Sequence, residues 1–436
     1  MMNAIEYTSV SDRIKIYKYE TDAFKSENIS VFFCIPTQKE KNVARSLLLS
    51  VLKRGTESYP SQRQINERLD ELYATLVSLK NQKYDGIQLL GISADVIKRD
   101  YTGDEDILSQ AAKVMGEMLF KPLIDENTDA FFKEYVNSEK ENYKSIILSQ
   151  MNEPRTYAAI RCREEMFSSL GVVDTLDGMC ERIDAQTPQT ITECYRGILD
   201  SLQLVVFYVG NRSAAEIARE LEKAMPEAKG STASAIGKGD VPLLENVDEP
   251  REVIESLKAS QGRLVMGYNC RTTWHDSDYY AMLLCNEILG ASPVSKLFMN
   301  VRERLSLCYE CSSVYNSARG AIFVTTGIDS DNYLLAREAI EAQVADIKNG
   351  NISDAELSAA KKSISNVYAA VCDSPNAIER FYLGRIISGV EIDLEGFLKK
   401  ISTLTRDDVV RAAQRLSLHT VYFLRGEGEE PEADYE

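Results

Sequence analysis

The feature that most constrains this chain of 436 residues is an internal repeat. The apolar segment 87–95, which contains Gly91, is matched by the segment 321–331, which contains Gly327. In both segments an apolar run leads to Gly-Ile and then to a polar turn with Asp, a pattern typical of a strand and its exit. A repeat of this length predicts two copies of one supersecondary arrangement.

Two further pairs of matching segments follow in the same order. Helical patterns are interrupted at Pro154 in the first half and at Pro375 in the second half. Because the residue before a proline avoids the helical region, each break predicts a kink or short turn between two helices. Thr187 and Thr405 then begin two capped helices, each of which leads to a closing strand that ends at a glycine. We therefore predict two homologous domains.

The order of strands and helices within each half indicates an α+β fold, because the elements do not alternate one for one. We expect each domain to hold a mixed, mostly antiparallel sheet flanked by helices. The predicted N-terminal domain spans 1–225 and the C-terminal domain 256–426. Residues 226–255, which begin with small and polar residues, are predicted to form a linker, and 427–436 an acidic tail.

Charge and composition exclude several functions. The formal net charge of −17 argues against a nucleic-acid-binding surface. The two histidines, His275 and His419, lie far apart, so no helix can carry the paired histidines of a zinc peptidase. We interpret His275 as a surface loop residue and His419 as a packing residue. The sequence shows no signal peptide and no apolar run of membrane-spanning length, so we expect a cytoplasmic protein without a membrane partner.

The nine cysteines show no disulfide framework. Cys308 and Cys311 form a C-x-x-C pattern, but a zinc site needs two more ligands and no second pair lies nearby. We interpret the pair as two half-buried thiols on a strand, and we expect no metal and no cofactor.

Segment 288–314 carries the first half of a family resemblance. Residues 295–298 read Ser-Lys-Leu-Phe, and Arg302 begins a stretch that reads R-E-R-L-S-L-C-Y and ends at Tyr309. This segment resembles the insulinase/pitrilysin zinc peptidases, which include the mitochondrial processing peptidases and show S-[RK]-L-F followed by R-E-[KR]-x-[GS]-L-x-Y. Through the repeat, the resemblance covers essentially the whole chain and implies one half of a peptidase clamshell.

The resemblance also locates the family's zinc motif, in which this chain differs. In segment 44–60, the two histidine positions fall on Ser46 and Ser50, and the catalytic glutamate position falls on Leu49. The third zinc ligand of the family matches Glu139, which we interpret as a carboxylate on a solvated helix face. The resemblance therefore implies an inactive chain that has kept the fold and lost the metal centre.

In the family, the arginine and tyrosine that match Arg302 and Tyr309 contribute to the peptide-binding site. The chain is thus similar to the inactive partner of the two-chain peptidases of Firmicutes. The first hypothesis is a non-catalytic, peptide-binding subunit that supplies Arg302 and Tyr309 to a zinc site held by a partner with H-x-x-E-H.

Two alternatives remain. The chain is either an inactive scaffold or peptide-binding homodimer without a peptidase role, or an enzyme that uses another nucleophile. The second alternative is disfavoured, because no G-x-S-x-G motif occurs and neither histidine has the context of a catalytic triad.

Overall fold

The computed structural model describes residues 5–9, 13–103, 105–171, 173–200, 203–228, 242–257, 261–390 and 393–426. Most of the predicted linker's first half and the whole predicted acidic tail, 427–436, lie outside the described residues.

The first sheet contains six strands, and its hydrogen bonding is mostly antiparallel. Its order is β1 (Ile5–Ser9), β2 (Ile14–Glu20), β8 (Leu204–Gly210), β3 (Ser26–Pro36), β5 (Ile87–Ile97) and β4 (Leu76–Tyr84). Only the β2–β8 pair is parallel among these strands. A two-stranded ribbon, β6 (Ile124–Asp125) and β7 (Ala130–Phe131), lies outside this sheet.

The second sheet contains five strands and repeats this mixed character. Its order is β11 (Cys308–Asn316), β12 (Ala321–Ile328), β10 (Gly262–Asn269), β13 (Ser417–Gly426) and β9 (Arg251–Leu257). The β13–β9 pair is parallel and the others are antiparallel. The predicted α+β fold with mixed, mostly antiparallel sheets is confirmed.

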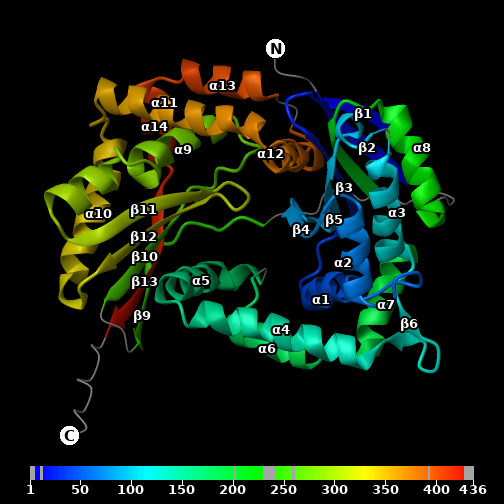
Figure 1. Cartoon of the computed structure of the whole chain (residues 1–436). Helices are drawn as coiled ribbons and strands as arrows, with labels where there is room; N and C mark the ends of the chain where they lie inside the picture. The colour runs from blue at the N-terminus through cyan, green and yellow to red at the C-terminus, as the bar shows by residue number, and fades with distance from the viewer. Residues whose placement is uncertain are drawn as a thin grey trace, which may run out of the picture. The chain divides into compact units, whose positions relative to one another are not determined.

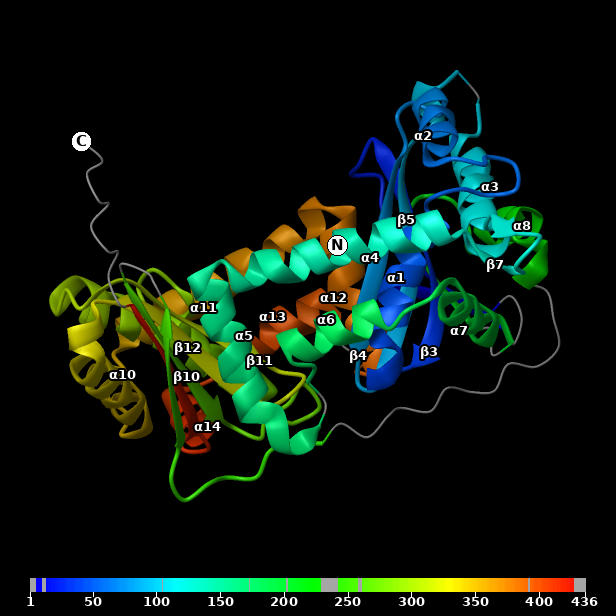
Figure 2. The ribbon, with the colours of Figure 1, turned by 90° about the horizontal axis from the view of Figure 1, so that it is seen from below.

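Helices cover both sheets (Figures 1 and 2). Those of the first half are α1 (Asn42–Leu52), α2 (Gln62–Glu71), α3 (Ile107–Phe120), α4 (Lys133–Met151), α5 (Pro154–Phe167), α6 (Leu176–Asp184), α7 (Pro188–Asp200) and α8 (Ala214–Ala224). Those of the second half are α9 (Tyr279–Asn286), α10 (Tyr333–Lys348), α11 (Asp354–Ala369), α12 (Pro375–Ser388), α13 (Leu394–Thr403) and α14 (Arg406–Ala413). Among the described residues, no helix has the length and apolar character needed to cross a membrane.

The secondary structure predicted for the repeated segments is confirmed. The apolar segments around Gly91 and Gly327 are strands β5 and β12. Pro154 and Pro375 each stand in the first turn of a helix, where the missing N–H of proline removes no helical hydrogen bond. Thr405 caps α14 by accepting a hydrogen bond from the backbone of Asp408, before the closing strand β13.

In the first sheet, the two faces carry different helices. Odd-numbered residues of β3 and β4 face α1 and α3, since Asn81 donates to Ser46 of α1 and Phe33 packs edge-on against Phe120 of α3. Even-numbered residues face α12, where Ser30 and Lys80 both contact Glu379. Helix α12, from the second half of the sequence, therefore covers one face of the first sheet.

The second sheet has the reciprocal arrangement. One face, which includes Val265 and Phe323, forms a core cluster with Cys162 and Met166 of α5. The opposite face packs on helices of its own half; for example, Phe423 of β13 stacks on Tyr333 of α10 with ring centroids 4.5 Å apart. A helix from the first half thus covers one face of the second sheet.

The two compact units of the chain reflect this exchange. Unit 1 comprises 1–146, 177–240 and 371–393, and unit 2 comprises 147–176, 241–370 and 394–436. Each unit thus includes a helix from the other sequence half. The domain bounds 1–225 and 256–426 were drawn from the sequence repeat. They describe which segments match one another in sequence, not which segments pack together, and they remain a proposal.

Two segments before β11 have an unusual helical winding. Both η5 (Glu287–Ala291) and η6 (Leu297–Arg304) are π-helical. The backbone N–H of Leu305 donates to the carbonyl of Asn300, five residues earlier, at 3.1 Å. The side chain of Asn300 also donates a hydrogen bond to Gln343 of α10.

The interpretations of the two histidines are confirmed, and the C-x-x-C pattern lies on a strand as predicted, except that Cys311 is buried rather than half-buried. His275 is exposed on the loop before α9, and His419 is buried on β13, with its Nδ1 2.9 Å from the Thr420 hydroxyl. Cys308 and Cys311 both lie on β11 as thiols, Cys308 half-buried and Cys311 buried.

Candidate functional site

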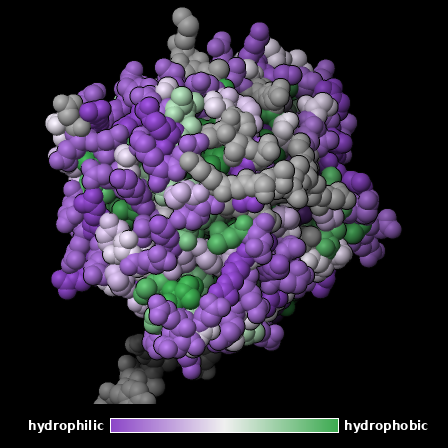
Figure 3. Space-filling model, turned by 90° about the vertical axis from the view of Figure 1, so that its right-hand side faces the viewer, coloured by the Kyte–Doolittle hydropathy of each residue, from purple (hydrophilic) through white to green (hydrophobic). Residues whose placement is uncertain are grey.

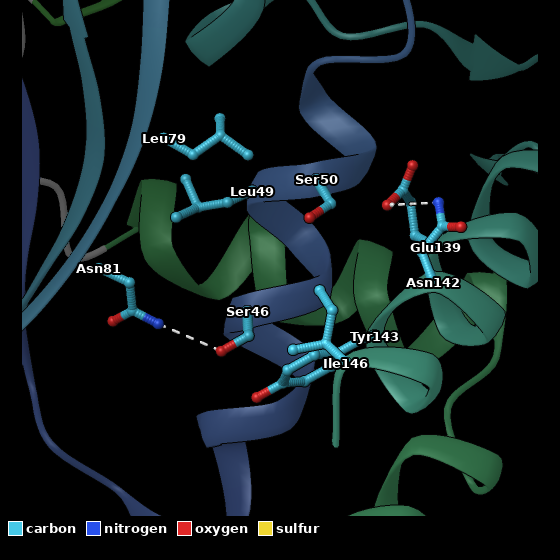
Figure 4. Close-up of a pocket in the computed structure, with 9 residues that line it drawn as sticks. All are labelled: Ser46, Leu49, Ser50, Leu79, Asn81, Glu139, Asn142, Tyr143 and Ile146. Carbon is cyan, nitrogen blue, oxygen red and sulfur yellow. Dashed lines mark hydrogen bonds between the residues drawn. The ribbon is translucent and has the colours of Figure 1, made fainter. Parts of the chain in front are cut away.

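Helix α1 carries the segment that matches the family's zinc motif. Its core face is buried and includes Leu47, Leu48 and Val51. Ser46, Leu49 and Ser50 lie on the other side of the helix and line a pocket of about 230 Å³ in unit 1 (Figure 4). The predicted set of three residues is therefore brought together in one cavity.

The remaining walls of this pocket come from β4 and α4. Its lining is completed by Leu79, Asn81, Glu139, Asn142, Tyr143 and Ile146. The Asn81 amide donates to the Ser46 hydroxyl at 3.1 Å and accepts a hydrogen bond from Gln88 at 2.9 Å. Arg45, which is buried, donates in turn to Gln88 at 2.7 Å. This chain of hydrogen bonds fixes the polar wall of the pocket.

Glu139 does not lie on a solvated helix face, so that interpretation is wrong. Its side chain is 12% exposed and forms an ion pair with the Arg54 guanidinium. Arg54 also donates to the Ser138 hydroxyl at 2.9 Å, and Asn142 donates to the second carboxylate oxygen of Glu139 at 3.4 Å. A carboxylate that is shielded from water needs hydrogen-bond donors or a cation beside it, and the Arg54 guanidinium supplies both here.

The residues in this pocket do not fit a zinc ion. A catalytic zinc site needs three protein ligands and an open position for water. Ser46 and Ser50 offer neutral hydroxyls, Leu49 offers no ligand atom, and the charge of Glu139 is engaged by Arg54. Among the residues that the structure describes, no group of three or more His, Cys, Asp or Glu residues is placed to hold a metal ion. The pocket offers hydroxyl groups and apolar surface instead of a Lewis acid.

Arg302 and Tyr309 share a second pocket, which lies in unit 2. This pocket of about 370 Å³ is bounded by η6, the start of β11 and the end of β12. Between η6 and β11 the chain turns at Ser306, whose φ of 53° is in the left-handed region. The turn directs both predicted residues into one cavity.

Both side chains are open to solvent. The Arg302 guanidinium lies 4.5 Å from the centroid of the Phe298 ring, and its Nε is 3.5 Å from Glu303. Tyr309 is exposed, and 77% of the surface of this residue is accessible to solvent. In the described part of the chain, the Tyr309 hydroxyl makes no hydrogen bond. The forked donors of an arginine and a free phenol suit the carbonyl groups of a peptide.

Sequence reasoning missed the partners of these residues. Arg54 was not recognised as the counter-ion of Glu139. Glu139 matches a zinc ligand of the family, and without a zinc ion such a carboxylate needs another cation beside it. Asn81 was also missed, because the polar sequence of β4 gives little strand signal. The stacking of Arg302 on Phe298 follows from a four-residue spacing that a helical pattern does reveal.

Comparisons with known proteins identify relatives that are named as inactive peptidases. Residues 186–364 match the protein family described as "Peptidase M16 inactive domain". A Bacillus subtilis protein named "Probable inactive metalloprotease YmfF" is 28% identical over 408 residues, which are 93% of this chain and 94% of that protein.

Solved structures share the whole architecture. A conserved protein from Enterococcus faecalis V583 has a TM-score of 0.88 and 26% identity, covering 99% of this chain and 100% of that one. The peptidase M16 inactive domain from Pseudomonas fluorescens has a TM-score of 0.74 and 17% identity, covering 98% of this chain and 100% of that one, and at that identity it supports the fold alone.

Proposed function

This chain belongs to the insulinase/pitrilysin family of zinc peptidases, the M16 peptidases, as an inactive member, and we propose that it is the non-catalytic, peptide-binding subunit of a heterodimeric zinc peptidase. In this proposal a homologous partner with an intact H-x-x-E-H motif holds the zinc ion and the general base. This chain supplies Arg302 and Tyr309 to the shared substrate.

The observation that carries the proposal is the contrast between the two pockets. Ser46, Leu49 and Ser50 provide neither the zinc ligands nor the general base that peptidase chemistry needs. Arg302 and Tyr309, by contrast, face a common cavity with their polar ends accessible. A chain that acted only as a scaffold would have no chemical reason to keep both groups accessible in one cavity.

Each of the two groups has a specific role in this proposal. The Arg302 guanidinium donates to carbonyl oxygens of the bound peptide and orients it. The Tyr309 hydroxyl donates to the oxygen of the scissile carbonyl, where negative charge develops in the transition state. Both roles are electrostatic, and neither requires a proton to leave this chain.

The peptide binds in an extended form along a sheet edge. Strand β11, which carries Tyr309, is an edge strand of the second sheet, and β4, which lines the pocket of Ser46, is an edge strand of the first. Edge strands leave backbone N–H and C=O groups that an extended peptide can pair with. The formal net charge of −17 favours basic or neutral peptides over acidic ones.

We place this activity in the cytoplasm. All nine cysteines of the chain are free thiols, which is the usual state in a reducing compartment.

The test is the effect of Arg302→Ala on a reconstituted pair. The chain is co-purified with an H-x-x-E-H-bearing homologue from the same host, and turnover of a fluorogenic peptide library is measured. We expect the variant to lower kcat/KM by roughly 10- to 100-fold while the pair elutes unchanged from size exclusion. Arg304→Ala, on the same π-helical segment, is the matched control.

Unchanged turnover in the Arg302→Ala pair would remove the catalytic role of this pocket. Peptide binding by the isolated chain, without any partner that restores cleavage, would instead support the peptide-binding homodimer or scaffold.

A further inference from the structure

Cys308 and Cys311 lie on the same face of β11, although they are three residues apart. On a regular strand, residues at this spacing point to opposite faces. Here the pairing with β12 shifts between Cys308 and Glu310, so that Cys308 lies opposite Ile328 and Cys311 opposite Thr326. Because residues 326 and 328 share one face of β12, this bulge brings both thiols to that face.

The acidic residue between the two cysteines is held on the other face. Glu310 lies opposite Gly327, and its carboxylate accepts a hydrogen bond from Arg263 at 2.9 Å. Arg155 of α5 pairs with its second oxygen at 2.8 Å. The negative charge nearest to the thiols in sequence thus has two cationic partners on the side away from them, although it still raises the pKa of both thiols.

The two thiols differ in exposure and in acidity. Cys308 is half-buried and lines the pocket of Arg302, whereas Cys311 is buried. A hydrogen bond from the Cys311 thiol, against the effect of burial, lowers the pKa of Cys308 to about 7, with further help from Thr326 and the Arg302 guanidinium. The same hydrogen bond and burial raise the pKa of Cys311. The Cys308 sulfur is therefore suited to attack a substrate, and the Cys311 sulfur is suited to form a disulfide with it afterwards.

We infer that Cys308 and Cys311 form a redox-active dithiol site that reduces hydroperoxides and closes to a disulfide. The bulge brings both thiols to one face of β11, and the pocket of about 370 Å³ opens Cys308 to a small peroxide. The inference goes beyond the proposed peptide-binding role and does not depend on a partner chain.

The reaction has two steps. The Cys308 thiolate attacks one peroxide oxygen, so that an S–O bond forms, the O–O bond breaks, and the departing oxygen takes a proton and leaves as water or alcohol. The Cys311 thiol then attacks the Cys308 sulfur, an S–S bond forms, the S–O bond breaks, and hydroxide leaves as water with the Cys311 proton. The two thiols lose two electrons and the peroxide gains them.

The first test is peptide mapping of the full chain after exposure to hydrogen peroxide. The reduced protein is treated with an equimolar amount, the remaining thiols are blocked with iodoacetamide, and the digest is analysed without reductant. We expect the peptide with both cysteines to lose two hydrogen atoms and resist alkylation. Cys180, half-exposed on α6, is the internal control and stays reduced.

Two variants separate the roles of the sulfurs. In Cys311→Ser, Cys308 should stop at the sulfenic acid and be trapped by dimedone. In Cys308→Ser, Cys311 should remain a thiol. Alkylation of Cys311 in wild-type protein after peroxide treatment, with Cys308 also free, would overturn the inference.

A pH profile gives an independent readout. The titratable and charged groups around Cys308 are Arg302 and Glu303 of η6, Tyr309 and Cys311 of β11, and Asp329 after β12. Glu310, on the opposite face of β11, acts on Cys308 only through its charge. Alkylation of Cys308 should be half-maximal near pH 7 and, at pH 7, about threefold faster than that of an ordinary thiol, after allowance for lower nucleophilicity. Arg302→Gln should move the midpoint upward. A midpoint above pH 8 would contradict the dithiol site.

Discussion

The ammonium group of Lys80 lies 3.4 Å from the carboxylate of Glu379, although 299 residues separate them in the sequence. Lys80 also donates to Asn376 at 2.7 Å, and Ser30 donates to Glu379. The Glu379 side chain is 1% exposed, so these partners replace the hydrogen bonds to water that its carboxylate lacks. The contact therefore fastens α12, from the second half of the sequence, to the first sheet.

Removal of the Glu379 carboxylate should destabilise unit 1. Glu379→Ala leaves Lys80 and Ser30 without their acceptor, and breaking a buried pair in this way costs about 3 kcal/mol. Glu379→Gln keeps the size of the side chain and one acceptor oxygen, so it should lower the free energy of unfolding less. Urea unfolding monitored by circular dichroism measures both, with exposed Glu395→Ala on α13 as the control. If Glu379→Ala lowers the free energy of unfolding no more than the control does, packing alone holds α12 against the sheet.

The corresponding contact in unit 2, around Glu255, should make the free energy of unfolding depend on pH. Burial raises the pKa of Glu255, but hydrogen bonds from Arg161, Tyr422 and Tyr157 outweigh it and leave the pKa below the ordinary 4.5. A lowered folded-state pKa adds stability above pH 4.5, which is lost as the pH falls through the folded value.

Glu255→Gln should therefore remove part of this pH dependence. The free energy of unfolding of wild type should fall more steeply than that of the variant as the pH drops from about 5 to about 3. Glu249→Gln, on the exposed segment before β9, controls for net charge. Parallel curves for wild type and Glu255→Gln would contradict the assignment.

Reinstating the family's zinc ligands should not be enough to bind zinc tightly. In the triple variant Ser46→His, Leu49→Glu, Ser50→His, the carboxylate of Glu139 is still held by Arg54. Adding Arg54→Gln frees this ligand, and we expect zinc affinity to rise by about tenfold in chelator competition. Equal affinities with and without Arg54→Gln would show that Glu139 is not restrained by its ion pair.

Tyr309→Phe should separate binding from turnover in a reconstituted pair. Loss of an oxyanion donor lowers kcat by about 100-fold while leaving substrate affinity nearly unchanged. Tyr101→Phe, another exposed tyrosine, serves as the control. An equal fall in affinity and turnover would make Tyr309 a peptide contact without a role in the transition state.

Patterns local in sequence predicted much of the fold. The strands around Gly91 and Gly327 and the breaks at Pro154 and Pro375 follow from short-range sterics and alternation, so a single sequence reveals them. The replacement of the zinc motif at Ser46 and Leu49 was predicted through the family resemblance, which aligns these positions with the motif.

Long-range pairing could not be predicted in this way. The attachment of α12 through Glu379 and the pairing of Arg54 with Glu139 join residues that no periodicity connects. The hydrogen bond between Asn300 and Gln343 likewise joins two helices that no local pattern connects. The shared face of Cys308 and Cys311 depends on one bulge, and a regular strand would have placed them apart.

The central claim, that this chain completes a zinc site held by another chain, is tested most directly by gentle affinity purification of the tagged protein from its host. Mass spectrometry would identify what accompanies it, and metal analysis would measure zinc. We predict a stoichiometric companion that carries H-x-x-E-H, about one zinc ion per pair, and peptidase activity that depends on both chains. Recovery of the chain alone or as a homodimer, without zinc or activity, would contradict the claim.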